Sequence, residues 1–254
     1  MLRPVLTIAA IVAVLYLACC ILLFALQRSL IYFPHPPSSA QGTSTLTLHA
    51  EGTEVRVTVK PRTGTAAVFY FGGNAEDVHH SLPDLEAAFP GHALYLMHYR
   101  GYGASTGKPS EKNLVADGLA LFDRVRTEHP QVVVIGRSLG SGVAIQLATS
   151  RPVSRLILVT PYDSLVEIAA RQYSIFPIRW LMQDKFESWR YAPRVTAPTL
   201  LVEAEHDEIV PRASTEALFG HFSTGVATLR VVRGTGHNTI QESPEYVALL
   251  GGGR

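Results

Sequence analysis

The sequence predicts an α/β domain whose mostly parallel sheet is covered by helices on both faces, preceded by one N-terminal transmembrane helix. The chain opens with an uncharged apolar run at residues 5–26. From Ala66 onward, apolar runs too short for helices alternate with segments of helical spacing. Short strands buried on both faces and separated by helices are typical of a parallel sheet. The 254 residues suit one such domain and leave no room for a second full one.

Composition excludes several classes of function. The formal net charge is +1, with 22 basic and 21 acidic residues, so no electrostatic signal favours nucleic acid. Both cysteines, Cys19 and Cys20, lie in the apolar run, which leaves the rest of the chain without a disulfide or a cysteine metal site. His79, His80 and His206 lack metal-ligand spacing, so we expect no metal and no other cofactor.

The apolar run is long enough to anchor the chain in a membrane. At about 1.5 Å per residue, a helix over residues 5–26 crosses a hydrocarbon core of roughly 30 Å. The alternative is a cleaved signal peptide, but the small residues Ser38-Ser39-Ala40 lie well beyond the run, and the run exceeds the usual length. We expect an uncleaved anchor at 1–33 and a Pro-rich linker at 34–43. Arg3 favours a cytoplasmic amino terminus, and Arg28 argues against it.

The remaining elements follow from periodicity. Alternating residues 44–50 and 54–60 around Glu51-Gly52-Thr53 predict an antiparallel hairpin. Buried strands are expected at 66–71, 93–97, 132–135, 156–159, 199–202 and 227–232, and helices at 114–125, 143–148 and 215–219. These elements define a domain at 44–250 with a cap insertion at 161–194. The glycine-rich tail, 251–254, is expected to be disordered.

The strongest chemical signal is Gly136-Arg137-Ser138-Leu139-Gly140. A predicted strand ends on Gly136, and residues 141–150 have the composition of a helix. A strand, a sharp turn and a helix form the setting in which a serine is held strained and exposed as a nucleophile. The alternative is a glycine-rich turn with a passive serine. The setting favours Ser138 as the nucleophile.

A nucleophilic serine needs a base and a group that orients the base. In proteins with such a turn, the acid and then the histidine follow the serine, each beyond a strand. Asp207 follows the predicted strand 199–202, and His237 lies in a glycine-lined loop after the last one. Glu205 and Glu208 lie close to Asp207. Asp163 is a rival acid, whose other role would be to cap a helix beginning at Ser164.

Acyl transfer also needs donors for the oxyanion that develops on the substrate. The strand at 66–71 leads into Gly72-Gly73-Asn74-Ala75. By position, the backbone N–H groups of Asn74 and Leu139 would converge on the oxyanion. The alternative is a simple glycine turn.

Together these motifs resemble the α/β-hydrolase-domain serine hydrolases, in the branch with one N-terminal membrane helix. The resemblance runs over nearly the whole chain and includes Tyr99-Arg100-Gly101-Tyr102-Gly103, Gly136-Arg137-Ser138-Leu139-Gly140-Ser141-Gly142, Pro161-Tyr162-Asp163-Ser164 and Glu205-His206-Asp207-Glu208-Ile209-Val210-Pro211. It implies an α/β-hydrolase fold and an ester or thioester hydrolase with the triad Ser138, Asp207 and His237. Some relatives remove palmitate from proteins. Two departures are Gly72-Gly73, where the family has His-Gly, and His98, where it often has aspartate.

Substrate choice is expected to depend on the insertion at 161–194, which is rich in large apolar residues. A cap of this composition would receive an acyl chain, and we expect Phe176, Trp180 and Phe186 to contact it. Ordinary helix packing is the alternative for each of these residues. The expected substrate is a small-molecule or lipid-like acyl ester, and the expected position of the domain is outside the cytoplasm. An acyltransferase using the same serine and a catalytically silent binding module remain open.

Overall fold

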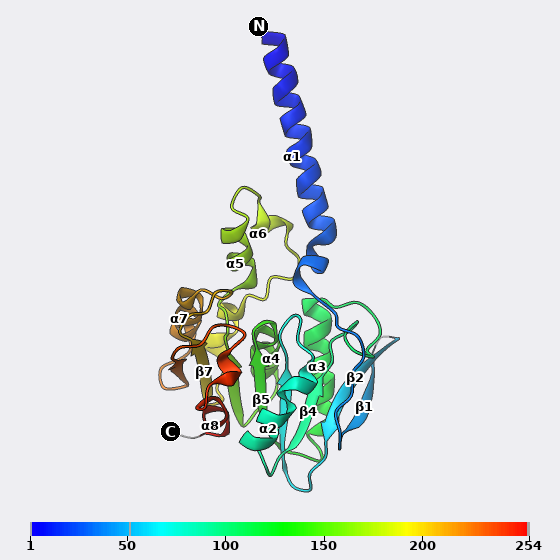
Figure 1. Cartoon of the computed structure of the whole chain (residues 1–254), viewed down its shortest axis with the longest axis vertical. Helices are drawn as coiled ribbons and strands as arrows, with labels where there is room; N and C mark the ends of the chain where they lie inside the picture. Colours follow the sequence, from blue (N-terminus) through cyan, green and yellow to red (C-terminus); the bar gives the residue numbers. More distant parts are fainter. Residues whose placement is uncertain (1, 51, 253–254) are drawn as a thin grey trace.

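The computed structural model describes residues 2–50 and 52–252, which form one mixed eight-stranded sheet with the order β1-β2-β4-β3-β5-β6-β7-β8 (Figure 1). Strands β1 and β2 form an antiparallel hairpin that pairs antiparallel with β4, and all other pairs are parallel. The strands are β1 (Ser44–Ala50), β2 (Thr53–Lys60), β3 (Ala66–Phe71), β4 (Ala93–Met97), β5 (Gln131–Arg137), β6 (Arg155–Val159), β7 (Thr199–Ala204) and β8 (Ala227–Val232). The predicted mostly parallel sheet is confirmed.

Helices cover both faces of this sheet, as predicted. The α-helices are α1 (Leu2–Ile31), α2 (Leu82–Ala88), α3 (Glu111–Val125), α4 (Leu139–Ser150), α5 (Leu165–Gln172), α6 (Ile178–Leu181), α7 (Arg212–His221) and α8 (Tyr246–Gly251). Alternate residues of β3 point to opposite faces, so Phe69 packs with α3 and α4 while Tyr70 packs with α2 and α8. Two apolar cores, one on each face, therefore hold the central strands in place.

Helix α1 projects away from the domain (Figure 1). Its most apolar 18-residue window has a mean hydropathy of 2.9, and only 6% of that window is buried. By length and composition this helix can cross a membrane, and a signal sequence would pass the same test. Its C-terminal end contacts the domain, and Tyr16 near its middle contacts the cap. Arg28 Nε lies 3.0 Å from Asp184 Oδ2, and the Tyr32 hydroxyl donates to the same oxygen at 3.1 Å.

The segment between β6 and β7 forms a small cap over one end of the sheet. It contains α5, α6 and two short 3₁₀ turns, η2 (Ser188–Arg190) and η3 (Ala192–Arg194). Ser164 is the N-cap of α5, and its hydroxyl accepts a hydrogen bond from the Glu167 N–H. Asp163, for which capping this helix was the alternative to a catalytic role, instead accepts a hydrogen bond from the Ser164 N–H at 2.8 Å.

The turn between β1 and β2 and the C-terminal tail were also predicted from the sequence. Glu51, in the predicted turn between β1 and β2, lies outside the described residues, and Gly52 beside it has φ of +72°. Part of the tail expected to be disordered is regular, because Gly251 ends α8 and Gly252 caps it in the left-handed conformation. Residues 253–254 of that tail lie outside the described residues.

Candidate active site

Ser138 lies at the sharp turn from β5 into α4. Its φ of +49° and ψ of −117° are strained for a residue with a side chain. The turn demands glycine on either side. A Cβ at Gly140 would collide with the carbonyl oxygen of Phe71, and one at Gly136 would collide with that of Gly140. The local sequence thus permits a turn that presents the serine hydroxyl at the carboxyl end of the sheet.

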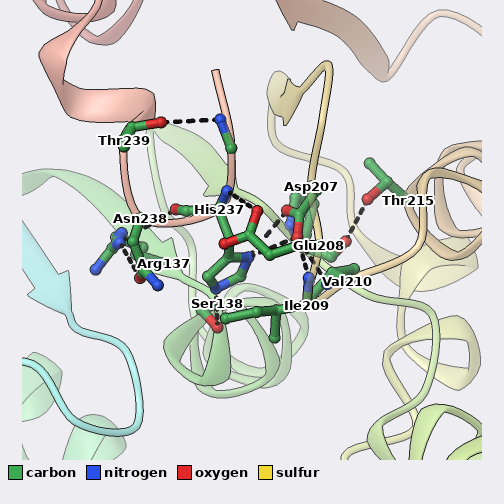
Figure 2. Close-up of polar contacts among 12 residues, drawn as sticks. Arg137, Ser138, Asp207, Glu208, Ile209, Val210, Thr215, His237, Asn238 and Thr239 are labelled. Carbon is green, nitrogen blue, oxygen red and sulfur yellow. Dashed lines mark hydrogen bonds and ion pairs between the residues drawn. The ribbon is translucent and has the colours of Figure 1, made fainter. Parts of the chain in front are cut away.

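A hydrogen-bonded chain joins Ser138, His237 and Asp207 (Figure 2). The Ser138 Oγ lies 2.9 Å from His237 Nε2, and His237 Nδ1 lies 2.9 Å from Asp207 Oδ2 and 3.0 Å from Oδ1. A carboxylate only accepts hydrogen bonds, so Nδ1 carries the proton and Nε2 is left to accept from the serine hydroxyl. Chemically, this arrangement can remove the hydroxyl proton as the oxygen attacks a carbonyl.

The four nearby carboxylates have different partners. Asp207 is held by the N–H groups of Ile209 and Val210, at 3.0 and 2.7 Å. The other three bond elsewhere: Asp163 to Ser164 and Ser214, Glu205 to the Gly234 N–H, and Glu208 to the backbone N–H of His237. Among these four carboxylates, only that of Asp207 contacts the imidazole ring of His237.

The loop after β3 comes close to the serine. A Cβ on Gly73 would lie 3.7 Å from the Cβ of Ser138. Asn74 and Leu139 line the same cavity as Ser138. The Asn74 carbonyl accepts from the Phe33 N–H at 3.1 Å and from the Tyr102 hydroxyl. The peptide of Asn74 is therefore fixed by Phe33, which follows α1, and by Tyr102.

A buried ion pair beneath the serine was not predicted from the sequence. Arg137 Nη1 lies 2.9 Å from Glu76 Oε2, and the same oxygen accepts from the Gly73 N–H at 2.8 Å. Arg137 also donates to the His237 carbonyl and to Asn238 Oδ1, both at 3.3 Å. Burial raises the pKa of Glu76, but Arg137 and the Gly73 N–H outweigh it and bring this pKa below its usual value. The pair ties together three loops of the site.

Arg137, the residue before Ser138 in the Gly-x-Ser-x-Gly motif, is the main sequence signal that could have revealed this pair. A long cation beside a nucleophile needs a partner when it is buried, and Arg137 is only 7% exposed. Glu76 lies three residues after Gly73 and is, with Asp77, one of two acids in this loop.

A cavity of about 1190 Å³ opens above Ser138. Ser138, Leu139 and His237 line its base. Its other apolar lining residues include Leu165, Ile168, Ala169, Tyr173, Ile178, Leu181 and Met182 of the cap, Ile209 and Val210 beyond β7, and Leu23, Leu30, Ile31 and Phe33 of α1 and the segment after it. The wall formed by the cap and α1 is therefore mainly apolar, whereas the loops after β3 and β8 add polar side chains such as Asp77 and Asn238.

The three large cap residues expected to contact an acyl chain are not among those lining this cavity. Trp180 is 90% exposed. Phe186 is fully buried beside Gly142, and Phe176 stacks on Tyr16 of α1 with ring centroids 5.7 Å apart. The expectation followed residue size, whereas position in the cap decides which side chains face the cavity.

Sequence comparisons place the chain among known proteins. Residues 71–191 match the family described as serine aminopeptidase, S33. An uncharacterised protein of Mycobacterium tuberculosis is 33% identical over 249 residues, covering 92% of this chain and 88% of that protein. The α/β-hydrolase domain-containing protein 17B of Homo sapiens is 31% identical over 163 residues, covering 62% of this chain and 54% of that protein.

Solved structures show the same architecture. An esterase from Pyrococcus furiosus superposes with a TM-score of 0.72 at 18% identity, covering 87% of this chain and 97% of that one. A putative hydrolase from Agrobacterium vitis superposes with a TM-score of 0.64 at 18% identity, covering 82% and 95%. The likenesses in sequence and architecture support a hydrolase. The chain belongs to the α/β-hydrolase family and has the α/β-hydrolase fold.

Proposed function

We propose that this protein is a serine hydrolase that cleaves carboxylic ester or thioester bonds of acyl substrates through an acyl-enzyme on Ser138. The observation that supports it is the hydrogen-bonded chain from Ser138 through His237 to Asp207 at the base of an apolar cavity. A nucleophile, its base and the group that orients the base are thus in contact.

The first half of the reaction forms the acyl-enzyme. Ser138 Oγ bonds to the substrate carbonyl carbon while its proton moves to His237 Nε2. Asp207 accepts a hydrogen bond from Nδ1–H of His237 and stabilises the imidazolium. The N–H groups of Asn74 and Leu139 donate to the oxyanion. When the carbonyl reforms, the bond to the alcohol or thiol breaks, and this leaving group takes the proton from His237.

The second half repeats these roles with water. His237 takes a proton from water as the water oxygen bonds to the acyl carbon. The bond to Ser138 then breaks, and the serine oxygen recovers a proton from His237. The products are a carboxylic acid and the free enzyme. If another nucleophile replaced water, the same site would act as an acyltransferase.

The cavity above the serine suits an acyl chain. Each buried methylene contributes about 0.8 kcal/mol at most, and apolar walls of the cap and α1 provide that environment. We also propose that residues 1–33 anchor the chain in a membrane, with the catalytic domain outside the cytoplasm. A substrate that partitions into the same bilayer is then concentrated near the site.

The test of the chemistry is labelling of the purified full chain with a fluorophosphonate, followed by esters and thioesters of graded chain length. We expect labelling on Ser138 and turnover that yields free acid. Transfer of the acyl group to an added alcohol in preference to water would identify an acyltransferase. A folded chain with neither labelling nor turnover would instead be a silent binding module.

The test of topology is separate. The full chain should remain in membranes through carbonate extraction. A reporter enzyme that works only outside the cytoplasm, fused after Arg254, should be active. Activity of a cytoplasm-specific reporter would reverse the proposed orientation.

A further inference from the structure

The last turns of α1 form part of the cavity wall. Leu23 and Leu30 line the cavity from this helix. Gln27 is only 8% exposed, and its side-chain amide donates to the Leu181 carbonyl at 3.1 Å and accepts from the Gln183 N–H at 2.6 Å. These bonds join α1 to the cap on one side of the cavity. If α1 were removed, the cavity would lose that wall.

The tip of the cap reaches the middle of α1. The Tyr16 hydroxyl donates to the Ile175 carbonyl at 2.9 Å, and its ring stacks on Phe176. Tyr16 precedes Ile31 by fifteen residues, which is about 22 Å along a helix. It also lies near the centre of the apolar run at residues 5–26. A bilayer that surrounds this run would therefore surround the cap tip.

The surface of the cap tip suits lipid. Ile175 is 73% exposed, Trp180 is 90% exposed and Tyr173 is 45% exposed. Large apolar side chains gathered at such exposure mark a membrane or a partner, and here a membrane-length helix lies beside them. Arg171 beside the tip is also exposed, and its long stem allows the guanidinium group to reach lipid phosphates, whereas Arg179 is paired with Glu167 through two hydrogen bonds of 2.7 Å.

We propose that the cap tip, residues 173–180, is inserted into the bilayer leaflet next to the catalytic domain, and that acyl chains enter the cavity from this leaflet between α1 and the cap. This inference rests on the proposed membrane anchor and hydrolase activity. It makes α1 a retained part of the site, in contrast to a leader that is cleaved.

The two tryptophans of the chain provide a matched test of depth. The full chain is placed in phosphatidylcholine vesicles, with Trp189→Phe leaving Trp180 as reporter and Trp180→Phe leaving Trp189. Lipids brominated at mid-chain should quench Trp180 at least twofold more than Trp189. Aqueous iodide should do the reverse, since Trp189 lies on η2, outside the cap tip, and is 38% exposed.

The outcomes separate this inference from the proposals on which it rests. Measured on the Ser138→Ala chain, quenching does not depend on turnover. A chain that floats with vesicles but exposes Trp180 to iodide as fully as Trp189 overturns insertion alone. A chain that does not float overturns the anchor as well. The second measurement is the intact mass of the membrane-purified chain. A mass that lacks residues 2–31 would show that α1 is cleaved and would overturn its proposed role as a wall of the cavity.

A second, independent inference concerns a histidine cluster where the linker meets the sheet. One possible ligand atom from each of His35, Asp77 and His98 lies within 4.8 Å of the others. His98 is 5% exposed, and within the described residues its Nδ1 has no hydrogen-bond partner. A Cβ on Gly103 would lie 3.0 Å from this nitrogen and 3.7 Å from His35 Cε1. The unpartnered nitrogen is therefore close to the second imidazole.

Hydrogen bonds around the cluster determine which nitrogen atoms are free. His79 Nδ1 lies 3.0 Å from Asp77 Oδ1, so it carries the proton, and in the neutral ring Nε2 accepts from the Thr58 hydroxyl at 2.7 Å. Thr58 Oγ1 then accepts from His98 Nε2 at 2.8 Å. This leaves a lone pair on His98 Nδ1. In His35, Nδ1 donates to the Pro36 carbonyl at 2.8 Å, which leaves a lone pair on Nε2.

Two imidazole lone pairs and a carboxylate are a donor set that first-row divalent cations prefer. We infer that His35, Asp77 and His98 bind Zn²⁺ or a similar cation, which would fasten the linker to the loop after β3. The sequence did not show this site because its residues come from three separate segments.

The test is a titration of the chelator-treated full chain, in detergent, with Zn²⁺ alone and with Co²⁺ as a spectroscopic substitute. We expect one equivalent to bind and to slow proteolysis of the linker. His35→Ala and His98→Asn should each weaken binding by more than about 100-fold, the upper end for losing an outer-shell partner. His49→Ala, at an exposed histidine on β1, should have no effect. Equal binding by all variants, or no saturable binding by the intact chain, would overturn the site.

Discussion

The base and the walls of the cavity are built in different ways. At the base, Ser138, Asp207 and His237 are held by strand ends and hydrogen bonds, and the Asp207 and His237 side chains are only 3% and 4% exposed. One wall comes from the short cap helices and the end of α1, whose lining side chains are mainly apolar. Directional bonds at the base fix atoms to within fractions of an ångström, whereas apolar contacts in the walls need only approximate shape.

This difference has a consequence for mutation. A change at the base should remove a chemical step, because no neighbour can replace an atom in the hydrogen-bonded chain. A change in the walls should alter affinity gradually, in proportion to the apolar area lost.

Ser138→Ala should have the largest effect. Removing the nucleophilic oxygen should reduce turnover by about six orders of magnitude, as for a serine protease nucleophile, and should abolish fluorophosphonate labelling. Ser150→Ala, at the far end of the same helix α4, is the control and should retain turnover. Circular dichroism should show both variants folded. Substantial hydrolysis by a folded Ser138→Ala chain would refute the proposed mechanism.

Asp207→Asn comes next. An amide in place of the carboxylate favours the wrong histidine tautomer, and turnover should fall by about 10⁴, as in the serine-protease example. Asp163→Asn is matched in chemistry and should lose less than tenfold, because Asp163 bonds to Ser164 and Ser214. The measurement is kcat with a soluble ester. If the two variants ranked in the opposite order, Asp163 would be the acid.

The same contrast explains what could be predicted from sequence. The strands and the positions of Ser138, Asp207 and His237 depend on local signals, namely short apolar runs followed by loops with glycine. The eight-stranded sheet confirmed the predicted fold, and the roles of the three residues stay a prediction supported by their contacts.

The walls could not be predicted in this way. Trp180 and Phe186 are both large and apolar, yet one is 90% exposed and the other fully buried, because cap packing decides their orientation. The Arg137–Glu76 pair also depends on loops brought together only in the fold. Long-range contacts of this kind leave no periodic signal in the sequence.

Glu76→Gln should weaken the base without changing the reacting atoms. It leaves Arg137 buried without its anion, so the free energy of unfolding should fall by about 3–5 kcal/mol. Since the folded pKa of Glu76 is below the unfolded value, its stabilisation is present above that value and is lost as pH falls through the folded pKa.

Urea unfolding at a series of pH values measures both effects. In the Glu76→Gln variant, the free energy of unfolding should fall less steeply at acid pH than it does in the natural chain. Glu128→Gln, in an exposed pair with Arg124, should change stability by no more than about 1 kcal/mol. If both variants had equally small effects, the pair would not fasten the loops of the site.

The smallest effect should come from the walls. Ile168→Ala and Leu181→Ala remove apolar groups that line the cavity. In the natural chain, kcat/KM for soluble esters in detergent should rise by up to about fourfold per methylene, which corresponds to 0.8 kcal/mol, until the cavity is full. Each variant should flatten this rise while acetate ester turnover stays within about twofold, because the hydrogen-bonded chain lies elsewhere.

Trp180→Ala is the contrasting change, since Trp180 does not line the cavity. Its chain-length profile in detergent should match that of the natural chain. If Trp180→Ala flattened the profile and the two wall variants did not, the acyl group would lie along the outer surface of the cap, and the cavity would not be the site that measures chain length.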